Sequence, residues 1–296
     1  MEHKTNDRRS VLMMVSSMLI FGTIGILRRY IPVPSAFLAF SRGIIGGLCI
    51  LFFLRLKNRK EQEKIQRLTL LELAVSGALI GINWILLFEA YNHTTVAVAT
   101  LCYYMQPTIV MLLSPLIFQE QLTARKAACA AAAIIGMVLV SGVMDNSAQG
   151  GSLRGVLLGL GAAVFYSAVV IMNNKITGIG AYPKTTVQLF AAGAVMIPYL
   201  LFTGGFSTES FTPAAVVLLL VVGVVHTGVA YVLYFRSMDG LRVQTVAILS
   251  YIDPVSALLF SAFLLQEPLS VMSVIGAVLI IGSAVFSETG PQSQDG

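Results

Sequence analysis

The stretch YYMQPTIVMLLSPLIFQEQLT, residues 103–123, returns later in the chain as YIDPVSALLFSAFLLQEPLS, residues 251–270. Each copy is an apolar run with a proline near its start and a Gln-Glu pair near its end. Chance accounts for one or two matches between such runs, so a longer series predicts an internal duplication. A shift of 147 positions pairs Val96 with Val243, Tyr104 with Tyr251, Pro107 with Pro254, Ser114 with Ser261, Gln119 with Gln266, Glu120 with Glu267, and Leu122 with Leu269.

The composition places the chain in lipid. Of its 296 residues, 56% are hydrophobic and 11% are charged, and the mean hydropathy is +0.83. A water-soluble globule of this size needs more polar surface than these residues supply. The formal net charge is +5, but the basic residues are scattered over connectors without a nucleic-acid-binding motif. We therefore expect a membrane protein with no nucleic-acid partner.

Hydropathy predicts an all-α integral membrane protein with ten transmembrane helices, because each apolar run reaches about 20 residues, the length that spans a bilayer. The first run is long and is not followed by a small-residue cleavage pattern, so we expect a retained helix rather than a signal peptide. The predicted helices are residues 10–31, 34–54, 69–90, 94–118, 122–143, 153–173, 184–203, 212–235, 241–265 and 269–287.

The distribution of basic residues predicts the topology. Positive charge gathers in cytoplasmic loops, and the connector between the second and third helices is the most basic one. If helices alternate from there, fifteen of the nineteen lysines and arginines face the cytoplasm, together with both termini. These are, in that connector, Arg55, Lys57, Arg59, Lys60, Lys64 and Arg67, and elsewhere Lys4, Arg8, Arg9, Arg125, Lys126, Lys175, Lys184, Arg236 and Arg242.

The duplication divides the chain into a first five-helix repeat, residues 1–145, and a second, residues 146–296, which together form one membrane domain. Because five is an odd number, the second repeat enters the membrane from the opposite side. Inverted repeats are typical of secondary transporters, in which two halves rock about a site near the middle of the membrane. A duplicated scaffold or sensor that transports nothing is the alternative of another class.

Several motifs resemble those of a known family. They are Phe21-Gly22 in the first helix, RGIIGGL from Arg42, and the two copies quoted above. With them, the chain is similar over nearly its whole length to the ten-helix, EamA-type members of the drug/metabolite transporter (DMT) superfamily. The resemblance implies a bundle with a central cavity between both halves, and export or exchange of amino acids and related metabolites. It names no substrate for this chain.

Four polar side chains are expected near the middle of the membrane. With a rise of about 1.5 Å per residue, Asn83 and His226 lie about 20 Å along their helices, and Gln106 and Asp253 about 18 Å. Polar groups at this depth are costly and usually face a cavity. These four, with the neighbouring Trp84, are the candidates for a substrate site. For His226 the alternative is a hydrogen-bonding role within the bundle, which is the more common role of a lone membrane histidine.

Two prolines interrupt the helices at the same level. Pro107 and Pro254 each remove one backbone hydrogen bond and free the carbonyls of Tyr103 and Ser250. Interrupted helices at corresponding positions of two repeats often line a transport site. The alternative is a simple kink whose freed groups are satisfied by side chains or water.

Asp253 is the leading candidate for a functional residue, because a lone carboxylate in the membrane must be paired, protonated or bound to a ligand. Arg42 lies within reach of it by helix counting, so a structural ion pair between them stands beside a role in substrate binding. Proton exchange through Asp253, with or without His226, is a further alternative. Tyr104 and its repeat counterpart Tyr251 are expected to offer aromatic faces to the substrate.

The Gln-Glu pairs have a different expected role. Glu120 and Glu267 lie just before the fifth and tenth helices, where a carboxylate favours the positive end of the helix that follows. We expect that role rather than substrate contact.

The sequence as a whole predicts a secondary transporter of a small polar metabolite, with an amino acid or related compound as the leading class, working by export or exchange in the plasma membrane. A multidrug exporter and a lipid-headgroup flippase are alternatives. There is no GxxxxGK[ST], HExxH or GxSxG motif, so we expect no enzyme, no catalytic residue, no cofactor and no metal. The partners are the substrate, membrane lipid and, in one alternative, protons; the oligomeric state is not predicted.

Overall fold

The computed structural model describes residues 8–56, 65–117, 123–140, 152–203, 211–238, 240–241 and 243–288. In this part of the chain all regular structure is helical, and it falls into ten runs that match the ten predicted segments. The elements are α1 (Arg8–Gly22), α2 (Ile24–Tyr30), α3 (Ser35–Leu56), α4 (Arg67–His93), α5 (Val96–Tyr103), α6 (Gln106–Ile117), α7 (Ala124–Val140), α8 (Leu153–Lys175), α9 (Ala181–Ala194), α10 (Met196–Thr203), α11 (Pro213–Val221), the π-helix η2 (Val222–Val229), α12 (Ala230–Met238), α13 (Val243–Ser250), α14 (Ile252–Leu264) and α15 (Val271–Glu288).

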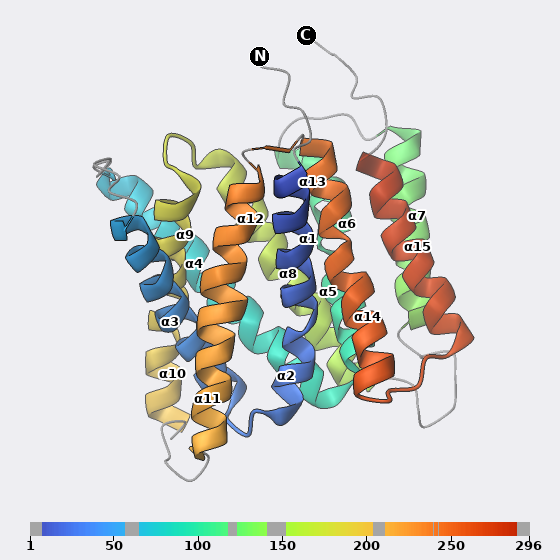
Figure 1. The fold of residues 1–296 in the computed structure, drawn as a ribbon. Helices are drawn as coiled ribbons and strands as arrows, with labels where there is room; N and C mark the ends of the chain where they lie inside the picture. The colour runs from blue at the N-terminus through green and yellow to red at the C-terminus, as the bar shows by residue number, and fades with distance from the viewer. Residues whose placement is uncertain are drawn as a thin grey trace.

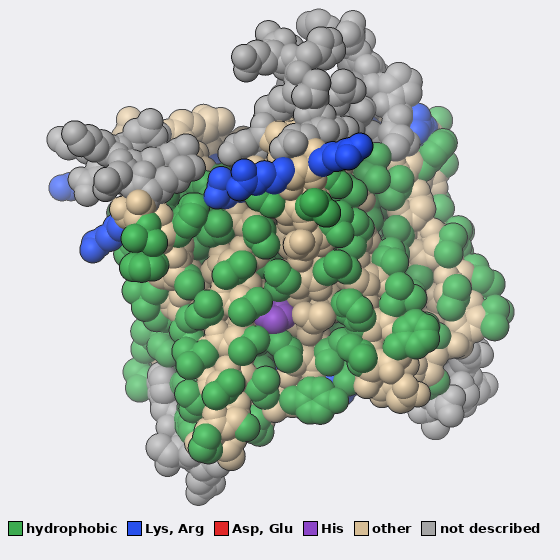
Figure 2. Space-filling model, in the orientation of Figure 1, with side chains coloured by type: hydrophobic (Ala, Val, Ile, Leu, Met, Phe, Trp, Pro, Cys, Tyr) green, Lys and Arg blue, Asp and Glu red, His purple; other side chains and the backbone are tan. Residues whose placement is uncertain are grey.

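The helices are those of a multi-pass membrane protein. Seven described runs are long and apolar enough to cross a membrane, and Ile248–Leu264 and Val271–Phe286 are shorter apolar helices. Large hydrophobic side chains are exposed on the bundle, including Leu116 at 82% and Phe202 at 91%. Figure 2 shows a side of the bundle on which hydrophobic side chains predominate. Such a surface is stable in lipid and not in water.

The bundle has two ends (Figure 1). We call the end at which α1 begins and α15 finishes the proximal end, and the opposite one, where α2 and α14 finish, the distal end. Most Lys and Arg side chains visible in Figure 2 gather near the proximal end. The basic residues Lys4, Lys57, Arg59, Lys60, Lys64 and Arg242 lie outside the described residues. Those that the structure places at proximal helix ends are Arg8, Arg9, Arg55, Arg67, Arg125, Lys126, Lys175, Lys184 and Arg236.

The two prolines coincide with breaks in the helices. The run through Pro107 is divided into α5 and α6 at Tyr104 and Met105, and the run through Pro254 is divided into α13 and α14 at Tyr251. Each break lies about one turn before the proline, where its ring removes a hydrogen bond and crowds the backbone. The same type of interruption therefore occurs at corresponding places in the two halves of the chain.

Glu267 shows a departure from expectation at the distal end. Its Oε2 accepts the backbone N–H of Val96 at 2.8 Å, so it stabilises the start of α5, not of the helix that follows it. At the start of α15, Ser270 takes that role, since its Oγ accepts the N–H of Ser273 at 3.0 Å. The sequence-based expectation for Glu267 is therefore wrong. Glu120 lies outside the described residues.

The centre of the bundle is closely packed through glycine. α3 packs along α9, and α4 packs along both α8 and α9. A Cβ atom placed on Gly43 of α3 would lie 2.6 Å from the carbonyl oxygen of Leu189 and 2.7 Å from the backbone nitrogen of Gly193. Because both neighbours are backbone atoms of α9, even a methyl group requires the two helices to move apart.

The substitution Gly43→Ala is expected to lower the thermal stability of the purified protein by an amount typical of core overpacking, about 1–3 kcal/mol. Gly282→Ala is the matched control, since nothing lies within 4 Å of a Cβ at that position in α15. Thermal unfolding in one detergent compares the two variants. Equal melting temperatures would contradict the close approach of α3 and α9.

Candidate functional site

A cavity of about 470 Å³ lies in the middle of the bundle, between helices from both halves of the chain. The first half contributes side chains from α1 to α6, and the second half contributes side chains from α8 and from α12 to α14. The lining residues that bear on its chemistry are Arg42, Trp84, Tyr91, Thr100, Tyr103, Tyr104, Gln106, Tyr166, Tyr231, Tyr234, Ser250, Tyr251 and Asp253.

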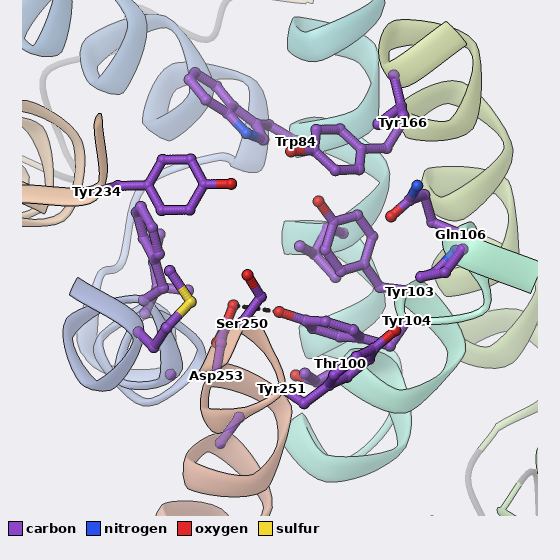
Figure 3. A pocket seen from close by; sticks show the side chains of 18 of the residues that line it. Trp84, Thr100, Tyr103, Tyr104, Gln106, Tyr166, Tyr234, Ser250, Tyr251 and Asp253 are labelled. Carbon is purple, nitrogen blue, oxygen red and sulfur yellow. Dashed lines mark hydrogen bonds between the residues drawn. The ribbon is translucent and has the colours of Figure 1, made fainter. Parts of the chain in front are cut away.

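Asp253 lies in the first turn of α14, immediately after the break at Tyr251. The hydroxyl of Tyr104 donates a hydrogen bond of 2.6 Å to its Oδ2 (Figure 3). Tyr104 lies at the corresponding break of the first half, between α5 and α6. The two interrupted helices therefore meet through this bond at the wall of the cavity.

Arg42 is the cationic group of the site. Its side chain, which is 6% exposed, leaves α3 and places the guanidinium carbon 4.2 Å from the centroid of the Trp84 ring. Its Nε donates to Thr227 Oγ1 at 2.9 Å. A cation–π contact of this kind contributes about 2 kcal/mol or more where water is excluded. In the described part of the chain, the two Nη groups have no hydrogen-bonded partner and belong to a residue that lines the cavity.

The π-helix η2 holds Thr227 in place for this bond. Thr227 Oγ1 also donates to the carbonyl of Val222, five residues earlier, at 3.2 Å. π-Helices are rare and are frequently found at functional sites. Here the element supplies the hydroxyl that orients Arg42, because it turns Thr227 toward α3.

Arg42 and Asp253 do not pair with each other. The ion pairs of 4.0 Å or less among the described residues join Arg29 to Glu267 and His93 to Glu89. The alternative of a structural ion pair between Arg42 and Asp253 is therefore wrong for this structure. The cavity instead has one cationic and one anionic group in its wall, each held by uncharged neighbours.

Aromatic rings form much of the remaining wall. The ring centroids of Tyr103 and Tyr166 lie 5.5 Å apart, those of Tyr103 and Tyr104 lie 5.6 Å apart, and those of Tyr104 and Tyr251 lie 6.4 Å apart. Figure 3 shows Tyr103 and Tyr104 together with Tyr166 and Tyr234 around one space. Tyrosine offers both an apolar ring and a hydroxyl, so this wall suits a substrate that is part apolar and part polar.

The structure gathers most of the predicted site residues but not all. Arg42, Trp84, Tyr104, Gln106, Pro107, Tyr251 and Asp253 line the cavity. Asn83 is buried and its Nδ2 donates to the carbonyl of Ala162 at 2.6 Å, which joins α4 to α8. His226 Nε2 lies 2.8 Å from Thr23 Oγ1, between η2 and the first transmembrane run. Asn83, His226 and Pro254 are not among the residues that line the cavity.

The sequence reasoning missed several lining residues, among them Ser250, Tyr166 and Tyr234. Ser250 is the repeat counterpart of Tyr103, so the internal alignment could have suggested it. Tyr166 and Tyr234 lie on α8 and α12 and have no such signal, because only the lateral packing of the helices turns them toward the cavity.

The fold and the cavity define a multi-pass membrane protein with a central cavity that is lined by both halves of the chain. The model of the EamA-like transporter family matches residues 8–142 and again residues 153–289. The chain therefore belongs to the EamA-like transporter family, within the DMT superfamily, and is a membrane transporter.

Known relatives agree with that membership. The chain is 25% identical over 279 residues to the uncharacterized transporter YxxF of Bacillus subtilis. The aligned residues make up 94% of this chain and 89% of that protein. It is 27% identical over 222 residues to protein PecM of Dickeya dadantii, covering 72% of each. One solved crystal structure superposes with a TM-score of 0.66 at 19% identity, over 94% of this chain and 96% of the other, which supports the fold.

Replacement of Thr227 by valine is expected to destabilise the protein by about 1.5–3 kcal/mol, because it removes a hydrogen bond to a charged group. Thr186→Val is the control: it removes a hydroxyl that bonds an uncharged carbonyl of its own helix, that of Tyr182, with an expected cost of about 0.5–1.5 kcal/mol. Thermal unfolding of both purified variants measures the difference. Equal losses would argue against Thr227 as the support of Arg42.

Proposed function

We propose that this protein is a secondary transporter that moves a small polar metabolite across the plasma membrane by alternating access. The leading substrate class is an amino acid or a related compound, and the direction is export or exchange. The observation that carries this proposal is the presence of Arg42 and Asp253 in the wall of one cavity without an ion pair between them.

The charges of the cavity complement those of a zwitterion. The free Nη groups of Arg42 suit a carboxylate, which arginine binds through two parallel hydrogen bonds. Asp253 retains Oδ1 for an ammonium group, since Tyr104 occupies Oδ2. A charged group away from water is stabilised by an opposite charge, so a substrate that bears both charges neutralises both residues at once.

The arrangement of the two halves supports alternating access. We infer that residues 1–145 and 146–296 are repeats of opposite orientation, in keeping with the double match of the family model. α1 runs from the proximal to the distal end and α8 runs the other way. Rocking of such repeats exposes a central site to each side in turn. The proximal end, with its basic residues, faces the cytoplasm in this proposal, together with both termini.

A multidrug exporter is the second candidate function. The tyrosine-rich wall and Trp84 favour it, because aromatic faces attract apolar cations. In that case Asp253 binds the cation or exchanges a proton for it, and Arg42 is not a substrate ligand. Amino-acid transport through this site requires a carboxylate on the substrate, whereas transport of an apolar cation does not.

Counterflow of radiolabelled amino acids into proteoliposomes tests the leading proposal. Arg42→Gln and Asp253→Asn are each expected to lower the initial rate about tenfold or more, because each removes a bond between the cavity and a charged group of the substrate. Arg154→Gln and Glu72→Gln are the matched controls, since both side chains are exposed.

The control variants should transport at the rate of the unchanged protein. Amino-acid counterflow that persists in both Arg42→Gln and Asp253→Asn would contradict the two-charge site. Counterflow of apolar cations that depends on Asp253 and not on Arg42 would favour the multidrug function instead.

A further inference from the structure

The short helix α2 runs from the cavity to the distal end of the bundle. It has seven residues and follows a break at Thr23, whose backbone N–H bonds the carbonyl of Ile20, three residues earlier, at 3.2 Å. Ile24, its first residue, lines the cavity, and its last turn reaches the distal end. A segment bounded by such a break can change its angle with few backbone rearrangements.

The break is in contact with neighbouring helices on two sides, η2 and α14. Thr23 Oγ1 lies 2.8 Å from His226 Nε2 of η2, the element that also supplies Thr227 to Arg42. On the other side, a Cβ on Gly22 would lie 2.0 Å from Ser256 Oγ and 3.0 Å from the carbonyl oxygen of Asp253. The hinge of α2 therefore contacts α14, which carries Asp253, and η2, which supplies the hydroxyl that holds Arg42.

The far end of α2 is fastened by Arg29. Its Nη2 donates to Glu267 Oε1 at 2.7 Å and to the carbonyl of Thr94 at 2.8 Å. Glu267 in turn accepts the N–H of Val96 at 2.8 Å and the hydroxyl of Ser261. One arginine thus joins α2 to the turn between α4 and α5 and to the turn after α14. We call this contact of Arg29 with Glu267 and Thr94 the distal latch.

The turn that carries Glu267 has an unusual backbone. Gln266 has φ of 54°, the one positive φ among the described residues other than glycine. This left-handed conformation is unfavourable for a residue with a side chain, and residues held in it cluster at functional sites. Here it ends α14 and directs Glu267 back toward Ser261, whose carbonyl accepts the Glu267 N–H at 3.2 Å.

The helix packing differs between the distal and the proximal side of the breaks. The two distal half-helices, α5 and α14, pack against each other. The corresponding proximal half-helices pack on other elements, α6 on α7 and α8, and α13 on α1 and α15. The distal latch spans the place where α2, α5 and α14 meet, on the distal side of the cavity.

We propose that the distal latch is the gate of the cavity on the distal side, with α2 as its moving part and Thr23 as its hinge. The proposal rests on the alternating access proposed above. When the cavity opens distally, Arg29 leaves Glu267 and α2 swings away from α5 and α14. When the cavity opens proximally, the latch is formed as in this structure.

Cysteine accessibility tests the gate without any substrate. Two reporters are made in a background in which Cys49, Cys102 and Cys129 are alanine: Thr100→Cys in α5, on the distal side of the cavity, and Ser250→Cys in α13, on its proximal side. Both residues line the cavity. A membrane-impermeant maleimide is applied to each membrane face in turn, in intact cells and in inverted vesicles, and the labelling rates are measured.

Arg29→Gln and Glu267→Gln are each expected to raise distal labelling of the Thr100→Cys reporter about three- to tenfold, in keeping with the loss of a partly exposed ion pair and its hydrogen bonds. Proximal labelling of the Ser250→Cys reporter should fall, because the cavity then spends less time open to that side. Arg154→Gln, which removes an exposed arginine at the same end, should change neither rate.

Unchanged distal labelling in both latch variants would overturn the proposal. A rise in the labelling rates of both reporters from both membrane faces would also overturn it. That result would show a general loss of packing in the bundle and not a shift from the proximally open to the distally open state. The labelling result does not depend on which molecule is transported. A failure of the latch and a failure of amino-acid counterflow are therefore separate outcomes.

Discussion

Among the described residues no carboxylate forms an ion pair with Arg42, so its charge has to be stabilised inside the membrane by other groups. An isolated charge at that depth is costly, and in this chain the guanidinium is held by the Trp84 ring and by the hydroxyl of Thr227. The close approach of α3 to η2 makes the second contact possible, since a Cβ on Gly46 would lie 2.3 Å from Thr227 Cγ2. The position of Arg42 thus depends on Thr227 of the π-helix, and the position of Thr227 depends on the close packing of η2 against Gly46 of α3.

Arg42 and Asp253 remain unpaired because each is held by other side chains, Arg42 by Trp84 and Thr227 and Asp253 by Tyr104. Because each charged group has uncharged neighbours of its own, the cavity keeps both available to a ligand. The break at Tyr104 places its hydroxyl on Asp253, and the break at Thr23 brings the first transmembrane run against Asp253 and His226. Interrupted helices therefore build the site and also provide the place where a half-helix can move.

Much of this architecture could be predicted from the sequence. The ten helical runs, the gathering of described basic residues at one end and the breaks near Pro107 and Pro254 follow from hydropathy and from backbone chemistry, which act locally. The depth of a residue in the membrane can also be predicted, because it is counted from the end of its helix with a constant rise per residue. This is why Asp253, Gln106 and Trp84 could be placed at the level of the cavity.

Lateral contacts could not be predicted in this way, because the rotation and the neighbours of a helix are set by packing. Asn83 is buried, but its side chain turns toward the carbonyl of Ala162 and joins α4 to α8 instead of lining the cavity. His226 turns toward the hinge at Thr23. Glu267 caps α5, a helix 171 residues away in sequence, which no local capping rule indicates.

The central claim is that Arg42 and Asp253 bind the two charges of one substrate. The most direct measurement is a thermal-shift titration of the purified protein with leucine, phenylalanine and threonine, each compared with its amide and its N-acetyl form, because a ligand that binds the native state raises the melting temperature. The account predicts that at least one free amino acid stabilises the protein and that blocking either its carboxylate or its amine removes most of the shift. Equal stabilisation by an amino acid and its amide, or by its N-acetyl form, would contradict it.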